Sequence, residues 1–271
     1  MKKYIIEFIG TFFLVLTIGL SGGNALAIGV VLAAMVYMGG YISGAHYNPA
    51  ITLGILIQKK IKAIEAGKYM LVQLIAAFVA AAIYTVVHGS KMIVTPGTGV
   101  SFSAALLVEA IFTFALVSVV LHTVVNKKTK DNDYYGLAIG FILMAGVYAG
   151  GHISGGAFNP AVGLGPNIYN WSYLSSHLSN LWLYLIGPFL GGILASLIYT
   201  LTSISSYLHP YYYTLTPIPM CLCPYQSIFI LVLLCLYSFC CTFICIPQLL
   251  YSYACTRMPK HSITFVVHRV A

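Results

Sequence analysis

The sequence predicts an all-α membrane protein, with six transmembrane helices and two half-membrane helices arranged as an inverted repeat. Three observations support this fold class. The chain of 271 residues is 60% hydrophobic and 7% charged, with a mean hydropathy of +0.92, which is typical of a multispanning membrane protein. Residues 40–54 recur as residues 151–165 with the same residue at nine of fifteen positions. Both copies contain Asn-Pro-Ala, a triplet typical of a helix start.

The two copies read GYISGAHYNPAITLG and GHISGGAFNPAVGLG. They share Ile-Ser-Gly, Asn-Pro-Ala and a closing Leu-Gly, and upstream the sequence at 26–29 recurs at 137–140. An internal repeat defines an architecture more firmly than one short motif does. Each half of the chain contains three apolar spans and one Asn-Pro-Ala box. Because three is odd, the second half must be inverted, which places the functional site near the midplane where interrupted helices meet.

Each Asn-Pro-Ala box predicts the start of a helix. Asparagine is a favoured N-cap, proline is favoured at the first helical position, and alanine is the best helix former. The first of these helices can continue to about Ile57, which makes it about 14 Å long, half of a ~30 Å hydrocarbon core. Non-helical backbone at that depth must be buried in protein or line a cavity. The box residues are Asn48, Pro49, Ala50, Asn159, Pro160 and Ala161.

The first half of the repeat, about residues 1–90, contains apolar spans at 4–20, about 25–42 and roughly 69–88. The small residues that follow the first span are also typical of a signal-peptide cleavage site. However, the pattern Glu7-x-x-x-Thr11-Phe12 recurs inside the chain as Glu109-x-x-x-Thr113-Phe114. Cleavage would delete one member of this matched pair, so we interpret the first span as a transmembrane helix.

The second half of the repeat, about residues 102–202, contains apolar spans at about 104–125, 135–149 and about 178–200. A loop rich in Gly, Ser, Thr and Pro joins the two halves at 89–101. The last span contains Gly187, Gly191 and Ala195, four residues apart, a spacing typical of close helix packing in membranes. Residues 1–202 therefore form one predicted membrane domain.

Lysines lie almost entirely on one side of the predicted membrane. The opposite side carries only Lys91, which predicts a cytoplasmic N-terminus by the positive-inside rule. The net charge of +8 is also typical of nucleic-acid binding. Because the lysines cluster at the ends of apolar runs, we predict that the partner is a lipid bilayer and not nucleic acid. The N-terminus and the loops after the second and fourth spans carry Lys2, Lys3, Lys59, Lys60, Lys62, Lys68, Lys127, Lys128 and Lys130.

The tail, residues 203–271, differs from the rest of the chain because it is rich in Tyr, Cys and Pro and has no counterpart in the repeat. Residues 227–246 could span a membrane by length alone. Such a seventh span would place Arg257, Lys260 and Arg269 outside, against the charge rule. The tail is therefore either an extra hydrophobic anchor or a segment unrelated to the repeat, such as read-through in an altered frame.

The same tail contains residue types that bind zinc. Cys221 and Cys223 lie two residues apart, and His209 and His261 flank them. This spacing fits no standard zinc site, so we predict no metal.

The two boxes predict a barrier to ions. Two half-helices that meet at their N-termini direct two positive dipole ends at one point, where cations and protons are opposed and neutral solutes are not. Asn48 and Asn159 are expected to cap with the side-chain oxygen and to keep an NH2 donor free for a passing water or hydroxyl group. The alternative is that both asparagines are helix caps only.

With both boxes in this context, the chain resembles the aquaporin, or major intrinsic protein, family over about residues 3–200. The resemblance implies a channel domain at 1–202 and a homotetramer in which each protomer has its own pore. It also implies that Glu7 and Glu109 support the loops before the half-helices. The alternative for these intramembrane carboxylates is a proton relay. His46 and His152 lie near the boxes without metal spacing, so packing or hydrogen bonding is the interpretation, with His46 among the supporting residues.

The resemblance also locates a selectivity filter, and here the chain departs from familiar water channels. Val162 stands where those channels have arginine, and the other filter positions are Ile28, Val147 and Gly156. Glycerol facilitators usually have Arg-Asp after the second box, whereas this chain has Val162-Gly163. The loss of arginine removes a charge and a fixed pair of donors, which should widen the constriction.

The sequence therefore predicts a passive channel for water and small neutral solutes that excludes ions and protons. No nucleophile–base pair or phosphate-binding loop is visible, so we predict neither an enzyme nor a cofactor. One alternative is a facilitator of glycerol, urea, ammonia or peroxide with little water selectivity. An alternative of another class is a structural or junctional membrane protein with a vestigial pore.

Overall fold

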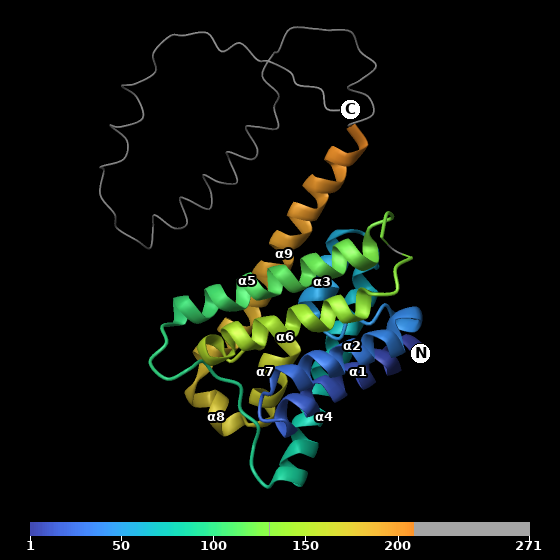
Figure 1. Cartoon of the computed structure of the whole chain (residues 1–271). Helices are drawn as coiled ribbons and strands as arrows, with labels where there is room; N and C mark the ends of the chain where they lie inside the picture. The colour runs from blue at the N-terminus through green and yellow to red at the C-terminus, as the bar shows by residue number, and fades with distance from the viewer. Residues whose placement is uncertain (130, 209–271) are drawn as a thin grey trace, which may run out of the picture. The chain divides into compact units, whose positions relative to one another are not determined.

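The computed structural model describes residues 1–129 and 131–208, which form a bundle of helices without strands in this part of the chain (Figure 1). Short loops join most of the helices, and a longer loop joins α4 to α5. In chain order the elements are α1 (Lys2–Leu20), α2 (Ala25–Ser43), α3 (Pro49–Ile57), α4 (Ala63–His88), α5 (Phe102–Val120), the π-helical turn η1 (Leu121–Val125), α6 (Tyr135–Ser154), α7 (Pro160–Tyr169), α8 (Trp171–Ser176) and α9 (Leu178–Leu208).

Six helices in the described residues are long and apolar enough to cross a membrane: α1, α2, α4, α5 with η1, α6 and α9. They correspond to the six predicted spans. The two helices that begin at the Asn-Pro-Ala boxes, α3 and α7, have only 9 and 10 residues. At 1.5 Å per residue they are about 14–15 Å long, which is half of a bilayer core. The bounds of α3 are those expected from the sequence.

Four features differ from the sequence prediction. α6 continues to Ser154, five residues beyond the end expected for its span. α4 begins at Ala63, six residues earlier than expected, so Lys68 lies in a helix and not in the preceding loop. A helix that projects beyond the hydrocarbon core can carry charge on its exposed turns, because long side chains reach the interface there. α9 continues to Leu208. The short helix α8 follows α7 and was not predicted, because a six-residue helix leaves no periodic pattern.

The helices pack as two equivalent halves. α1 packs against α2 and α4 in the first half, as α5 packs against α6 and α9 in the second. Each half-helix crosses over, so α3 contacts α9 and α7 contacts α4. α2 and α6 meet where the halves join, and there a Cβ on Gly140 would lie 2.4 Å from the carbonyl oxygen of Gly29. This contact requires glycine, because no side-chain atom fits between the two backbones.

The predictions for the tail lie outside the described residues. These are the seventh span at 227–246 and the zinc-ligand types Cys221, Cys223, His209 and His261.

Candidate pore

The two half-helices are capped in the same way. The Oδ1 atom of Asn48 accepts a hydrogen bond of 2.8 Å from the backbone N–H of Ala50, and that of Asn159 accepts one of 2.9 Å from Ala161. A proline follows each asparagine at the first helical position, where its missing N–H costs no hydrogen bond. The sequence therefore encodes both starts locally, through the residue types at the cap and the first turn.

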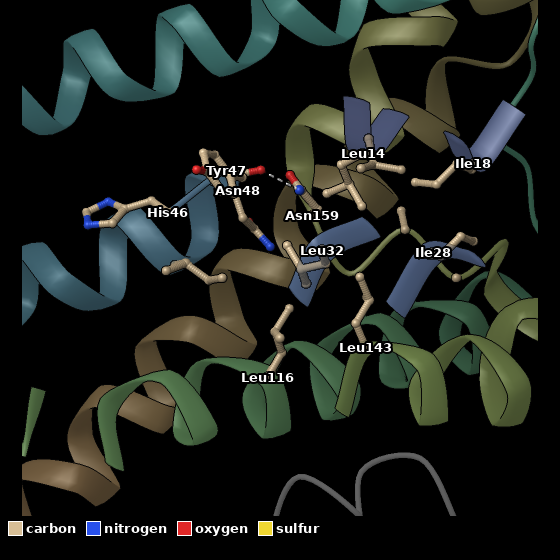
Figure 2. Close-up of a pocket in the computed structure, with 14 residues that line it drawn as sticks. Leu14, Ile18, Ile28, Leu32, His46, Tyr47, Asn48, Leu116, Leu143 and Asn159 are labelled. Carbon is tan, nitrogen blue, oxygen red and sulfur yellow. Dashed lines mark hydrogen bonds between the residues drawn. The ribbon is translucent and has the colours of Figure 1, made fainter. Parts of the chain in front are cut away.

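The side-chain NH2 groups of the two capping asparagines connect the two halves of the repeat. The Nδ2 atom of Asn48 donates to the carbonyl oxygen of Phe158 at 2.9 Å. Reciprocally, Nδ2 of Asn159 donates to the carbonyl oxygen of Tyr47 at 2.9 Å, the contact drawn in Figure 2. The NH2 group of each asparagine was predicted to be free, but one of its two hydrogens is bonded to the opposite loop. Because an amide nitrogen carries two donors, one N–H on each asparagine remains available.

The loops before the boxes share a backbone conformation that side chains rarely adopt. Tyr47 and Phe158, which immediately precede the two asparagines, have φ angles of +51° and +48°. Ala45 also has a positive φ of +50°, and Gly156 takes the equivalent place in the second loop with +64°. Such positions are strained for residues with a Cβ and persist only where surrounding contacts enforce them. The contacts that enforce them here come from two buried glutamates.

Glu7, on α1, is fully buried and accepts four hydrogen bonds. Its Oε1 atom accepts from the Ser43 hydroxyl at 2.7 Å and from the backbone N–H of His46 at 2.9 Å. Its Oε2 atom accepts from the backbone N–H of Tyr47 at 2.7 Å and from Nε2 of Gln73 at 2.9 Å. The carboxylate thus binds two successive N–H groups of the first loop, at the point where the chain turns into α3.

Glu109, on α5, does the same for the second loop. It is fully buried, and its Oε1 atom accepts from the Ser154 hydroxyl at 2.8 Å and from the N–H of Ala157 at 3.0 Å. Its Oε2 atom accepts from the N–H of Phe158 at 2.7 Å. Every donor in these two sets is a hydroxyl, an amide or a backbone N–H, so the arrangement gives neither glutamate a titratable group to exchange a proton with through these bonds.

A narrow cavity passes the meeting point of the half-helices, with a volume of about 10 Å³ (Figure 2). His46 lies at one end of the view, Ile18 and Ile28 lie at the other, and Asn48 and Asn159 lie between them. None of the lining residues is Asp, Glu, Lys or Arg. The wall combines the two asparagines and the loop backbone with apolar side chains from four long helices.

Two wider cavities adjoin the narrow one at its opposite ends. One has a volume of about 430 Å³ and shares Ile18, Ile28, Gly156 and Val162 with the narrow cavity. The other has a volume of about 640 Å³ and shares His46 with it. We call these the filter-side and the His46-side vestibules. The cavities are thus wide on either side of the boxes and narrow beside them.

The four filter positions named from the sequence are brought together on one side of the boxes. Ile28, Val147, Gly156 and Val162 all line the filter-side vestibule, and all except Val147 also line the narrow cavity. His152 is exposed and lines this vestibule too. His46 is buried at the other end, where its Nδ1 atom lies 3.1 Å from the Thr52 hydroxyl. In the described residues no three His, Cys, Asp or Glu side chains form a group that could hold a metal ion.

The apolar residues that line the narrow cavity were not predicted from the sequence. A signal for them was present in the repeat, because Leu116 follows Glu109 by seven residues as Leu14 follows Glu7. Leu32 and Leu143 stand at equivalent places before the two boxes. The missed lining residues are Leu14, Ile18, Leu32, Tyr47, Ile51, Leu116, Leu143 and Ala157.

Comparison with known proteins agrees with this geometry. Residues 1–199 match the major intrinsic protein family. The glycerol uptake facilitator protein-like 6 of Lactiplantibacillus plantarum is 36% identical over 214 residues, covering 72% of this chain and 95% of the relative. Aquaporin TIP2-3 of Arabidopsis thaliana is 37% identical over 193 residues, covering 70% of this chain and 73% of the relative.

A solved structure has the same fold. The X-ray structure of the aquaglyceroporin from Plasmodium falciparum superposes with a TM-score of 0.64 at 22% identity, covering 73% of this chain and 94% of that chain. With the six spans described above, this likeness confirms the predicted fold class.

Proposed function

The chain belongs to the major intrinsic protein family of multi-pass membrane channels, which are not enzymes, and from this premise we propose that it is a passive channel for water and small neutral solutes. Solutes diffuse through the path formed by the two vestibules and the narrow cavity. No covalent step, cofactor or energy source takes part. The observation that carries the proposal is a narrow cavity beside two half-helix N-termini that shares lining residues with a wider cavity at either end.

Ion exclusion is proposed to come from the half-helices. The N-termini of α3 and α7 meet at the narrow cavity, where the two asparagines hydrogen-bond across to the opposite loops. Each helix end carries about half a positive charge. No carboxylate lines the narrow cavity to offset that field, so a cation would lose its hydration without compensation. A neutral solute does not meet this barrier.

Solute selectivity is proposed to depend on the four apolar filter positions. Arginine at position 162 would present a charge and fixed donors, whereas Val162 presents neither. A solute with an apolar face loses less there than water, which forms up to four hydrogen bonds. The relatives include both a glycerol uptake facilitator and an aquaporin at almost equal identity. We therefore propose appreciable permeability to glycerol-sized neutral solutes relative to water.

The Val162→Arg variant tests this assignment. We expect it to lower glycerol permeability relative to water, because the longer side chain narrows the filter and adds a charge. Stopped-flow measurement of vesicles reconstituted with either form gives water, glycerol and urea permeability, and a pH dye in the same vesicles gives the proton leak. If the helix dipoles alone exclude protons, vesicles with the unmodified chain should show no proton leak.

Two results would contradict the proposal. Fast water flux with exclusion of glycerol by the unmodified chain would show that the filter is not permissive. Absence of flux for every solute would favour the structural or junctional alternative with a vestigial pore.

We also propose an orientation in the membrane and an assembly state. The lysine distribution supports a cytoplasmic N-terminus. The His46-side vestibule, which Lys60 and Lys127 line, would then face the cytoplasm. The family resemblance supports a homotetramer.

A further inference from the structure

We propose that Asn167 on α7 positions the loop between α4 and α5, so that Val94 on this loop forms a further wall of the solute filter. Asn167 is a positioning residue, because it lines neither the narrow cavity nor the filter-side vestibule and acts through Val94. The inference rests on the proposed channel function and names two residues that contribute to its solute selectivity.

Asn167 has no counterpart in the first half of the repeat. The equivalent residue, 111 positions earlier, is Leu56. The side chain of Asn167 is nevertheless buried, with 1% exposed. A buried amide requires hydrogen-bond partners, whereas leucine at the same place requires none. Since the repeat does not explain the asparagine, its partners indicate what it does.

The Asn167 amide binds the backbone of the loop at two points. Its Oδ1 atom accepts from the N–H of Val94 at 3.1 Å, and its Nδ2 atom donates to the carbonyl oxygen of Val94 at 2.8 Å. Nδ2 also donates to the carbonyl oxygen of Gly163 at 2.9 Å. Because one nitrogen reaches both carbonyl oxygens, the backbone of Val94 lies beside the turn of α7 that carries Val162. In the described part of the chain, the Val94 backbone has no hydrogen-bond partner other than Asn167.

This placement puts Val94 in the wall of the filter-side vestibule. Val94 is 6% exposed and lines the vestibule together with all four filter positions. Its neighbours Ile93 and Thr95 are exposed, so Val94 is the side chain that this stretch of the loop directs inward. Three of the filter positions also line the narrow cavity. A movement of the Val94 wall therefore changes the approach to the narrowest part of the pore.

Loss of the amide should release this wall without unfolding the protein. In Asn167→Leu the N–H and C=O groups of Val94 lose their partners, and buried backbone groups without partners are strongly disfavoured. We expect the loop to move until water reaches both groups. Gly97 limits the movement, because its N–H donates to the carbonyl oxygen of Ile153 at 3.0 Å. The loop therefore stays attached to the end of α6, and the filter widens locally.

Solute permeability tests the inference. We expect Val94→Ala to raise the ratio of erythritol to glycerol permeability roughly threefold, less than the about tenfold that one methylene is worth in a closed hydrophobic pocket. Asn167→Leu should raise this ratio at least as much. Water permeability should change less, because neither residue lines the narrow cavity. The measurement is stopped-flow light scattering of vesicles reconstituted with the full chain, with water, glycerol and erythritol as probes.

A double variant shows whether Asn167 acts through Val94. Effects of residues that act together are not additive, so Asn167→Leu combined with Val94→Ala should raise the ratio no further than the larger single change. Hydrogen–deuterium exchange gives a second readout, because the loop at 89–101 should exchange faster in Asn167→Leu. Asn167→Ser takes the place of Asn167→Leu if the leucine variant does not elute as a single species in detergent.

Gln58→Leu is the matched control. It also removes an amide at the end of a half-helix, since Nε2 of Gln58 donates to the carbonyl oxygen of Ser196 at 2.9 Å directly after α3. Gln58 borders neither the narrow cavity nor the filter-side vestibule. Its replacement should leave the permeability ratio and the exchange of the loop at 89–101 unchanged.

The outcomes distinguish the inference from the function on which it rests. An unchanged ratio in Val94→Ala, which keeps Asn167 and its hydrogen bonds, would overturn the inference and leave the channel function intact. Additive effects in the double variant, or a loop that exchanges as slowly in the Asn167 variant as in the unmodified chain, would do the same. Absence of flux for every solute in the unmodified chain and in all variants would overturn both.

Discussion

The two buried glutamates do the same task with different surroundings. Glu7 accepts four hydrogen bonds, from a serine, two backbone N–H groups and the side chain of Gln73. Glu109 accepts three, from the equivalent serine and N–H groups. In the second half Gly187 lies against the glutamate, and a Cβ there would come 2.7 Å from Cβ of Glu109. The contacts common to both glutamates are those that hold the loop. The hydrogen bond from the Gln73 side chain occurs only in the first half.

The difference extends into the half-helices. In the first half, the Thr52 hydroxyl connects Gln73 to the ring of His46 at the narrow cavity. In the second half, Ala157 and Gly163 stand at the equivalent positions, and the ring of Tyr184 occupies the space beside Gly163. In addition to its glutamate, the first half therefore uses further hydrogen bonds beside its box, whereas the second half uses the packed ring of Tyr184. The identical caps show that either support can hold an Asn-Pro-Ala helix in place.

Of the changes that test this difference between the halves, removal of a glutamate should destabilise the protein most. Glu7→Ala or Glu109→Ala takes the acceptor from two successive backbone N–H groups of a loop, and Glu7→Ala takes it from the Gln73 amide as well; each stranded donor costs about 1–3 kcal/mol. We expect either variant to lose most of its folded yield. Glu7→Ala should be the more severe because it strands one donor more. Folded yield by gel filtration in detergent and thermal unfolding of the surviving fraction would measure this.

Glu65→Ala is the control, since Glu65 pairs with Lys3 near the surface and should tolerate the change. Normal folding of Glu7→Ala or Glu109→Ala, with loss of only a pH-dependent flux, would favour the proton-relay alternative over the structural role.

A smaller change should make the hydrogen bonding of Glu7 resemble that of Glu109. Gln73→Leu removes the fourth donor of Glu7 and leaves three, as at Glu109. We expect a loss of about 1 kcal/mol, at the low end for a buried hydrogen bond. The loss is small because the variant also removes the Gln73 Oε1 atom, which is buried and has no hydrogen-bond partner within the described structure. Thermal unfolding of Gln73→Leu beside Glu7→Ala measures it. A loss as large as that of Glu7→Ala would show that the amide is essential to the loop.

Much of this arrangement could be predicted from the sequence, because it depends on local chemistry and on the repeat. Cap and proline preferences gave the start of both half-helices, and the matched Glu7 and Glu109 patterns indicated a paired role. The hydrogen bonds from Asn48 to Phe158 and from Asn159 to Tyr47 could not be predicted, since they join loops more than 100 residues apart. The fourth donor of Glu7 was missed for the same reason, because Gln73 lies on a different helix.

The narrow cavity was not predicted either, although the repeat pairs the leucines that line it. Leucine is so common in membrane helices that its position gives no signal by itself. Which leucines face the path depends on the rotation of four helices, and that rotation is set by contacts such as the one between Gly29 and Gly140.

The smallest effect is expected from a change at the residues that follow the two boxes, where the two halves also differ. Ile51 and Val162 occupy equivalent positions and both line the narrow cavity, but only Val162 also borders the filter-side vestibule. Ile51→Val makes the two positions identical by removing one methylene. We expect a loss of about 0.5–1.5 kcal/mol in stability, as is usual for Ile→Val in a core. Glycerol permeability should rise slightly, because removal of one methylene widens the narrow cavity only a little. Thermal unfolding and stopped-flow glycerol uptake measure both effects. A loss of stability without any rise in glycerol permeability would show that Ile51 does not limit solute passage.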